Sequence, residues 1–118
     1  MPRRILIVDD HDGFRRSAGR ALSAVGWEVV GEAGDGEGAL RAAADCEPDV
    51  VLLDVGLPDI SGIEVARRLH ESSPELAVVV VSTHDRADYG ELALASGARG
   101  FLSKIELTGE ALEALVES

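Results

Sequence analysis

The sequence predicts a single α/β domain in which a parallel five-stranded sheet is covered by helices on both faces. Short apolar runs alternate five times with stretches of helical periodicity, and no low-complexity or proline-rich linker separates them. Strands that are apolar throughout are typical of parallel sheets, whose crossover helices bury both faces. The length of 118 residues suits one domain, and we expect residues 1–118 to form it.

Each strand and helix has its own signal. Apolar runs mark the strands, apolar residues at helical spacing mark the helices, and glycine or proline marks several ends. The expected strands span residues 5–8, 27–32, 50–53 (followed by Asp54), 77–81 and 101–102. The first expected helix carries Phe14, Ala18, Ala21, Leu22 and Val25 and stops at Gly26. The later helices are expected over residues 37–44, 63–69, 89–96 and 107–116. Together they make five consecutive βα units.

The chain is acidic, with 11 Lys and Arg residues against 22 Asp and Glu residues and a net charge of −11. That balance argues against a nucleic-acid or anionic-membrane surface, because phosphate groups are bound mainly by Lys and Arg. A cation is the better small partner. The single cysteine, Cys46, cannot form an internal disulfide, and no apolar run approaches the roughly 18 residues of a membrane span. We therefore expect a cytoplasmic protein without membrane contact.

Polar residues follow four of the five expected strands. They are, in chain order, Asp9, Asp10, Asp54, Ser82, Thr83 and Lys104, the last being the only lysine of the chain. Ligands bind beyond the carboxyl ends of the strands in parallel sheets. If the first strand lies beside the third, three carboxylates converge, and like charges this close need a counter-ion, for which oxygen ligands favour Mg²⁺. Carboxylates, Mg²⁺, a hydroxyl and a lysine describe a phosphoryl-transfer site with Asp54 as the candidate nucleophile.

These residues stand in motifs that strongly resemble one family. The motifs are Val8-Asp9-Asp10-His11, Leu52-Leu53-Asp54 with Leu57-Pro58 and Ser61-Gly62, Val81-Ser82-Thr83, and Gly97-Ala98-Arg99-Gly100-Phe101-Leu102-Ser103-Lys104. The pattern resembles the receiver domains of two-component response regulators over nearly the whole chain, and most of all the LuxR/NarL-type subfamily. The fold that this resemblance implies is flavodoxin-like, a doubly wound (βα)5 sheet of strand order 2-1-3-4-5.

The resemblance also implies a role for each site residue. Asp54 would accept a phosphoryl group from a histidine kinase, with Ser82 and Lys104 binding the phosphoryl oxygens and Phe101, together with Ser82, forming the conformational switch. Mg²⁺, or Mn²⁺ in its place, would be held by Asp10, Asp54 and the backbone carbonyl of Gly56, with Asp9 acting through water. Such a domain is a phosphoacceptor and not a turnover enzyme.

The partners implied are a sensor histidine kinase, a second copy of the chain on phosphorylation, and an output domain in a longer parent protein that regulates transcription. The subfamily usually carries a helix-turn-helix output domain, and we expect none within these residues and no direct DNA binding by them. A stand-alone receiver, or one that binds partners without phosphorylation, is the alternative.

Four positions set expectations beyond the shared pattern. Ile105 replaces a common proline, so no cis-proline is expected there. Gly56, two residues after Asp54, offers no side chain to hold an attacking water, and Thr83 adds bulk beside the approach, which together predict slow loss of the phosphoryl group. His84 is the exception, because a neutral imidazole could act as a general base.

Two further interpretations are weaker. Residues 34–39 match the glycine pattern of dinucleotide-binding loops, but Asp35 and Glu37 would then face a pyrophosphate. A haloacid-dehalogenase-type, Mg²⁺-dependent aspartyl-phosphate phosphatase needs a second acid two residues after its nucleophile, where this chain has Gly56. His11 is expected to form hydrogen bonds at the surface and is not assigned to the metal, since hard Mg²⁺ prefers oxygen.

Overall fold

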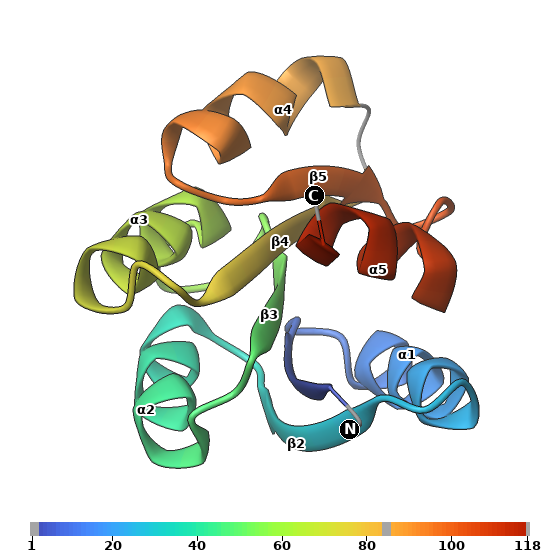
Figure 1. Ribbon diagram of the computed structural model, residues 1–118. Coiled ribbons are helices and arrows are strands. Elements are labelled where there is room, and N and C mark those ends of the chain that lie inside the picture. Colours follow the sequence, from blue (N-terminus) through green and yellow to red (C-terminus); the bar gives the residue numbers. More distant parts are fainter. Residues whose placement is uncertain (1–2, 84–85, 118) are drawn as a thin grey trace.

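A computed structural model describes residues 3–83 and 86–117 of the chain (Figure 1). Strands and helices alternate from end to end, as the sequence predicts. The elements are β1 (Arg4–Val8), α1 (Asp12–Ala24), β2 (Glu28–Ala33), α2 (Gly36–Cys46), β3 (Val50–Asp54), α3 (Gly62–Ser72), β4 (Ala77–Ser82), α4 (Arg86–Ala95), β5 (Gly100–Ser103) and α5 (Gly109–Glu117).

The five strands form one parallel sheet of order β2-β1-β3-β4-β5, which confirms the flavodoxin-like topology. In the middle of the sheet β1 pairs with β3, and Val8 stands opposite Leu53. The residues that follow this pair are Asp9 and Asp54. Pairing of β1 with β3 is therefore what brings the first two acids to the same point of the sheet edge.

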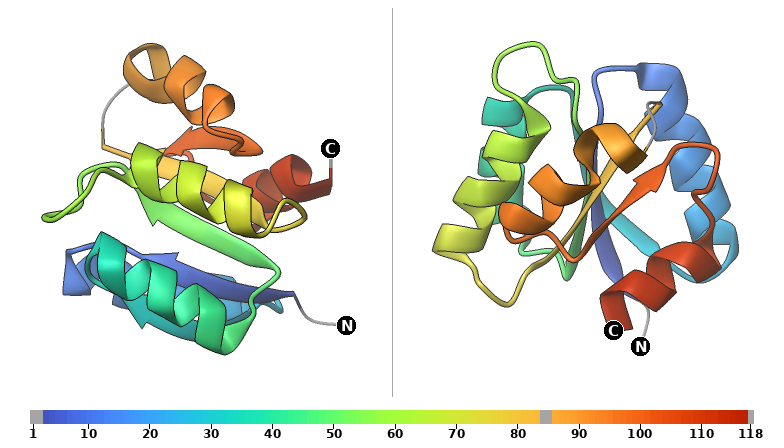
Figure 2. Two further views of the ribbon diagram at one scale, coloured as in Figure 1. Left: turned by 90° about the vertical axis from the view of Figure 1, so that its left-hand side faces the viewer. Right: turned by 90° about the horizontal axis from the view of Figure 1, so that it is seen from above.

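Helices cover both faces of the sheet (Figure 2). α1 and α5 lie on one face, and α2, α3 and α4 lie on the other. Successive residues of β1 serve the two sides alternately: Ile5 and Ile7 pack into the core beneath α1 and α5, and Leu6 and Val8 pack into the core beneath the other three helices. All four side chains are buried, and each contributes about 1.5–3 kcal/mol of hydrophobic free energy.

The bounds of some elements differ from the sequence prediction. α1 ends at Ala24, so Val25 lies beyond the helix and is 64% exposed, while Gly26 turns the chain with a φ of 100°. α5 begins at Gly109 and not at residue 107, because the hydroxyl of Thr108 accepts the backbone N–H of Ala111 and caps the helix. α4 begins at Arg86, ahead of the first residue with helical apolar spacing.

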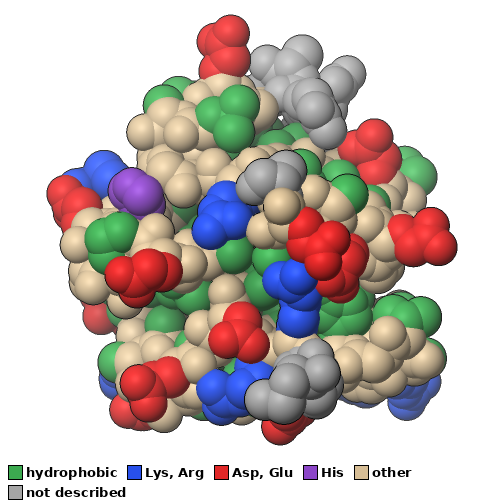
Figure 3. Space-filling view, viewed as in Figure 1, with side chains coloured by type: hydrophobic (Ala, Val, Ile, Leu, Met, Phe, Trp, Pro, Cys, Tyr) green, Lys and Arg blue, Asp and Glu red, His purple; other side chains and the backbone are tan. Residues whose placement is uncertain are grey.

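Charged and apolar side chains are mixed on the surface. On the face shown in Figure 3, basic side chains are separated by acidic and apolar ones and form no continuous basic patch. Among the described residues, no helix is both long and apolar enough to cross a membrane.

Gly62, the first residue of α3, should be essential for the position of Asp54. A Cβ at Gly62 would lie 2.8 Å from the carbonyl carbon of Asp54 and 2.9 Å from Cα of Val55, and backbone atoms cannot yield as a side chain can. We expect Gly62→Ala to lower the free energy of unfolding by about 2 kcal/mol or more. Chemical denaturation would measure this loss.

Gly19→Ala is the matched control. A Cβ at Gly19, in the interior of α1, meets its nearest atoms at the ordinary distance of 3.9 Å. This variant should gain up to about 1 kcal/mol, because alanine is the better helix former. A Gly62→Ala protein as stable as wild type would contradict the close approach between α3 and β3.

Candidate functional site

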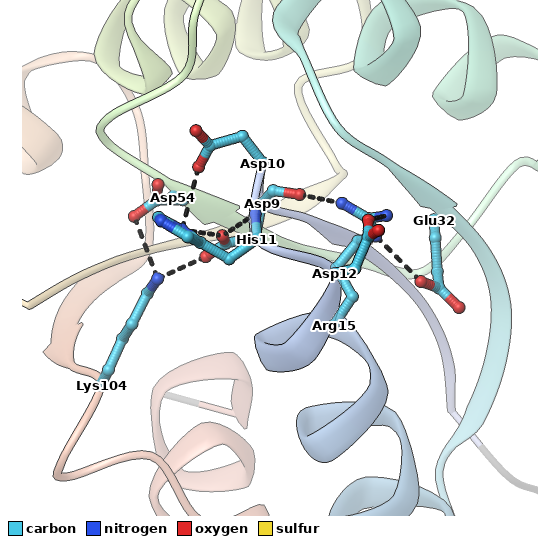
Figure 4. Close-up of polar contacts among 8 residues, drawn as sticks. All are labelled: Asp9, Asp10, His11, Asp12, Arg15, Glu32, Asp54 and Lys104. Carbon is cyan, nitrogen blue, oxygen red and sulfur yellow. Dashed lines mark hydrogen bonds and ion pairs between the residues drawn. The ribbon is translucent and has the colours of Figure 1, made fainter.

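The carboxyl edge of the sheet gathers the acids and the lysine that the sequence singled out (Figure 4). Asp9 follows β1 and is fully buried, and Asp54 ends β3 with an exposure of only 6%. Asp10 is exposed at the rim. The turn after β1 is fixed by a hydrogen bond from the backbone N–H of Asp9 to the carbonyl of Ala33 on β2 (3.0 Å). Two buried carboxylates thus lie on neighbouring strands.

Lys104 links these two carboxylates. Its Nζ lies 2.5 Å from Oδ2 of Asp9 and 3.7 Å from Oδ1 of Asp54. The ammonium also lies 4.2 Å from the centre of the Phe14 ring on α1, a cation–π contact. Oδ2 of Asp9 makes no hydrogen bond of good geometry, so the ion pair with Lys104 is its compensating contact. The predicted convergence of charges is confirmed, and the chain's single lysine partly balances it.

Burial raises the pKa of the Asp54 carboxyl. Removal from water is the largest cause, and the charge of Asp9 adds to it, as does that of Asp10 to a smaller extent. The ammonium of Lys104 and the backbone N–H of Gly56 act in the opposite direction without cancelling the rise. The carboxylate of Asp54 is thus held in a setting that favours its neutralisation, by a proton or by cations.

His11, which the sequence analysis expects to form hydrogen bonds at the surface, contacts the acids of the cluster. Its backbone N–H donates to Oδ1 of Asp9 (2.8 Å), and its Nδ1 lies 3.1 Å from Oδ1 of Asp9 and 3.1 Å from Oδ1 of Asp10. The ring is exposed and engaged in polar contacts, as expected, but its partners are the acids themselves. Its position directly after the two acids was the only available signal.

Arg15 is a residue of the site that the sequence analysis missed. From α1 its guanidinium donates to the backbone carbonyl of Asp9, contacts the carboxylate of Asp12 and pairs with Glu32 on β2 (3.0 Å). It fixes the turn that carries Asp9, and no sequence pattern pointed to the contact with a backbone carbonyl.

The remaining expected residues lie around the same edge. Ser82 is buried at the end of β4, and its carbonyl accepts the backbone N–H of Lys104 (2.8 Å). Phe101 on β5 is buried, with its ring stacked on that of Tyr89 from α4. Thr83 and Gly56 are exposed. His84, proposed from the sequence as a possible base, lies outside the described residues.

The loop with the dinucleotide-type glycine pattern is already occupied by an acid. The carboxylate of Asp59 accepts the backbone N–H groups of Gly36 (2.7 Å) and Glu37 (2.9 Å) at the start of α2. These hydrogen bonds lower the pKa of Asp59 to about 2. Asp35 caps the same turn by accepting the N–H of Gly38. Two carboxylates stand where a pyrophosphate would bind, which removes the dinucleotide interpretation.

Comparison with known proteins settles the family. The family model of the response regulator receiver domain matches residues 5–117. The chain belongs to the response regulator receiver domain family. By family it is a phosphoacceptor signalling module rather than a classic enzyme.

Individual relatives are response regulators, as the sequence motifs indicate. The chain is 39% identical over 116 residues to the response regulator GacA of Pseudomonas aeruginosa, covering 98% of this chain and 52% of GacA. It is 38% identical to the transcriptional regulatory protein DegU of Brevibacillus brevis, covering 92% of this chain and 46% of DegU. The chain therefore spans about half the length of these curated relatives, which are response regulators and transcription regulators.

Solved structures of response regulators superimpose closely on this chain. A LuxR-family response regulator from Aurantimonas superimposes with a TM-score of 0.91 at 30% identity, over 99% of this chain and 86% of that one. The receiver domain of the putative response regulator NarL from Mycobacterium tuberculosis gives 0.86 at 36% identity, over 97% and 96% of the two chains. The resemblance to the LuxR/NarL-type subfamily is confirmed.

Without metal, ionised Asp54 should make the domain less stable as pH rises. Because its pKa is raised in the fold, Asp54 contributes stability below its unfolded pKa of about 3.9, and this contribution is lost as pH rises through the folded pKa. In EDTA, Asp54→Asn should be more stable than wild type at neutral pH, with the difference shrinking toward about pH 4. Thermal melts across this range would measure it.

Asp45→Asn, which removes an exposed acid of α2, is the control and should follow the wild-type curve. Parallel curves for wild type and Asp54→Asn would show that Asp54 carries no charge penalty in the fold.

Proposed function

We propose that this receiver domain is phosphorylated on Asp54 by a sensor histidine kinase and relays that modification to a partner or output domain. The observation that carries the proposal is the placement of Asp54: a buried carboxylate at the carboxyl end of the middle strand, facing the ammonium of Lys104. Membership of the receiver family and the similarity to GacA and DegU support it.

The proposed reaction is a phosphoryl transfer. An oxygen of the Asp54 carboxylate attacks the phosphorus of a phosphohistidine, the phosphorus–nitrogen bond breaks, and the imidazole leaves with the electron pair and takes up a proton. The product is an acyl phosphate on Asp54. The ammonium of Lys104 and the hydroxyl of Ser82 pair with phosphoryl oxygens, which offsets the charge that spreads over them during transfer.

The acids fit a hard divalent cation. Asp9 and Asp10 offer oxygen ligands beside Asp54, and Asp9 is a fully buried carboxylate, one oxygen of which makes no hydrogen bond of good geometry. We assign Asp10, Asp54 and the carbonyl of Gly56 as ligands of Mg²⁺, with Asp9 acting through water and Mn²⁺ as a possible substitute. When bound, the cation would neutralise charge on the transferring phosphoryl group.

The same geometry supports a switch. Ser82 ends β4 and Phe101 lies on the neighbouring strand β5, so a movement of the Ser82 hydroxyl toward a phosphoryl oxygen is transmitted to the ring and to its neighbour Tyr89 on α4. Partners that prefer this state then shift the population toward it. The proposed outcomes are association of two copies and contact with an output domain, with transcription regulation as the role of the longer protein. Direct DNA binding by these residues is not proposed.

Phosphorylation of Asp54 is the first test. Acetyl phosphate with Mg²⁺ should add the mass of one phosphoryl group to wild type, seen by intact mass spectrometry, and EDTA should abolish the addition. Mn²⁺ should restore it. Asp54→Asn should not be labelled, because its amide cannot form the acyl phosphate.

Labelling of Asp54→Asn at the wild-type level would place the acceptor elsewhere. A wild-type protein that stays unlabelled but still binds its partner would favour the alternative, a receiver that acts without phosphorylation.

If Phe101 is part of the switch, its replacement should leave phosphorylation of Asp54 intact and remove the structural response to it. Phe101→Leu keeps an apolar side chain in the core, at a cost of about 1–1.5 kcal/mol, but removes the ring that contacts Tyr89. Its labelling rate should stay within about threefold of wild type, whereas the phosphorylation-induced amide shifts in α4 and β5 should largely disappear in NMR spectra. Equal shifts in both proteins would remove Phe101 from the switch.

The Gly56 and Thr83 positions predict a long-lived phosphoryl group, since Gly56 has no side chain to hold an attacking water and Thr83 adds bulk beside the approach. Phosphate release from wild type should be slow and independent of pH between about 6 and 8, where imidazole groups titrate. His84→Ala should leave the rate unchanged. A marked drop in the rate of this variant would identify His84 as a general base.

A further inference from the structure

The loop between β3 and α3, residues 55–61, begins directly after Asp54. At its base, the backbone N–H of Val55 donates to the carbonyl of Val81 on β4 (3.1 Å), and the N–H of Gly62 donates to the carbonyl of Val55 (2.9 Å). These hydrogen bonds join the base of the loop to β4 and to the start of α3. The outer part of the loop is fixed by other contacts.

Those contacts are made with α2, which lies beside α3 on the same face of the sheet (Figure 2). The carboxylate of Asp59 accepts the first two backbone N–H groups of α2, those of Gly36 (2.7 Å) and Glu37 (2.9 Å). The first N–H groups of a helix have no partner within the helix and favour negative charge. Asp59, 23 residues after Gly36, thus caps a helix to which it does not belong.

An apolar contact closes the same junction. A Cβ at Gly36 would lie 2.8 Å from Cδ1 of Ile60 and 3.0 Å from Cγ2 of Val65, so the missing side chain of Gly36 lets Ile60 pack against the start of α2. Ile60 is half-buried against the core beneath α2, α3 and α4. The loop is therefore fixed to α2 by a charged and an apolar contact, made by the adjacent residues Asp59 and Ile60.

Gly56 connects this junction with Asp54. Burial raises the pKa of the Asp54 carboxyl, and the backbone N–H of Gly56 acts on the same carboxyl in the opposite direction. Only two residues separate Gly56 from Asp59, and one of them is Pro58, whose ring fixes φ. A displacement of Asp59 would therefore be transmitted to Gly56 over a short, stiff segment.

We propose that Asp59 is a positioning residue for the phosphorylation of Asp54: by capping α2 it holds the loop so that the backbone of Gly56 stays beside the Asp54 carboxylate. The inference rests on the proposed function, which makes Asp54 the acceptor and the Gly56 carbonyl a ligand of Mg²⁺. In this assignment Asp59 touches neither the phosphoryl group nor the metal and acts through the backbone that it holds. A displacement of about 1 Å at a reaction centre can cost about a hundredfold in rate.

Asp59→Ala removes both hydrogen bonds, and Asp35→Ala is the matched control. Asp35 caps the same helix by accepting the N–H of Gly38 (2.6 Å), so its replacement removes one charge and one cap of α2 but leaves the loop tied. At saturating acetyl phosphate and Mg²⁺, Asp59→Ala should be labelled about tenfold more slowly than wild type, and calorimetric titration should show about tenfold weaker Mg²⁺ binding. Both values for Asp35→Ala should agree with wild type within about threefold.

A readout without metal or phosphate tests the positioning itself. In the metal-free protein, Asp59→Ala should shift the backbone amide resonance of Gly56 in ¹⁵N NMR spectra, and Asp35→Ala should leave it near its wild-type position. Asp59→Asn keeps one acceptor oxygen and should give intermediate values in all three measurements. This conservative variant carries the test if Asp59→Ala does not fold.

Equal labelling, equal Mg²⁺ affinity and an equal Gly56 resonance in Asp59→Ala and Asp35→Ala would overturn the inference and show that Asp59 only caps α2. A wild-type protein that is not labelled on Asp54 would instead contradict the proposed function. The resonance of Gly56 in the metal-free variants would still decide whether Asp59 positions the loop.

Discussion

The ion pair between Lys104 and Asp9 is the contact on which the geometry of the site depends. Two carboxylates that are almost fully buried, Asp9 and Asp54, stand on neighbouring strands, and such an arrangement is costly without opposite charge. A single ammonium from the end of β5 reaches both. The carboxyl ends of β1, β3 and β5 are thereby tied at one point, although β1 and β5 are not neighbours in the sheet.

The distribution of basic residues supports this special role of the lysine. Ten of the eleven basic residues are arginines, and several of them link separate elements. Arg3 pairs with Glu113 and Glu117 on α5, and Arg4 donates to the carbonyls at the end of α2. The forked guanidinium suits such multiple contacts, whereas the compact ammonium of Lys104 suits a small anion and two carboxylates at once.

The sequence predicted the elements well because strands buried on both faces and helices with one apolar face leave distinct patterns. It also predicted the meeting of Asp9, Asp54 and Lys104, since residues that follow parallel strands share one edge of the sheet. It could not predict the contacts of His11 and Arg15, because these depend on the path of the turn after β1 and, for Arg15, on a backbone carbonyl. The end of α1 at Ala24 was also not predicted, because the helical spacing of apolar residues continues to Val25, beyond the helix.

Lys104 also connects the site to both faces of the sheet. Its ammonium lies over the ring of Phe14, on the face of the sheet that α1 covers. Phe101 lies on β5, beside the strand that ends in Ser82, and packs on the face that α4 covers. Under the proposed reaction, a phosphoryl group on Asp54 competes with Asp9 for the ammonium. A shift of the ammonium toward that group would change its contact with Phe14 on the α1 side, while Ser82 and Phe101 would respond on the α4 side. Under the proposed reaction, Phe14 and Phe101 therefore stand on opposite faces of the sheet, each in line with one of the groups that would bind the phosphoryl oxygens.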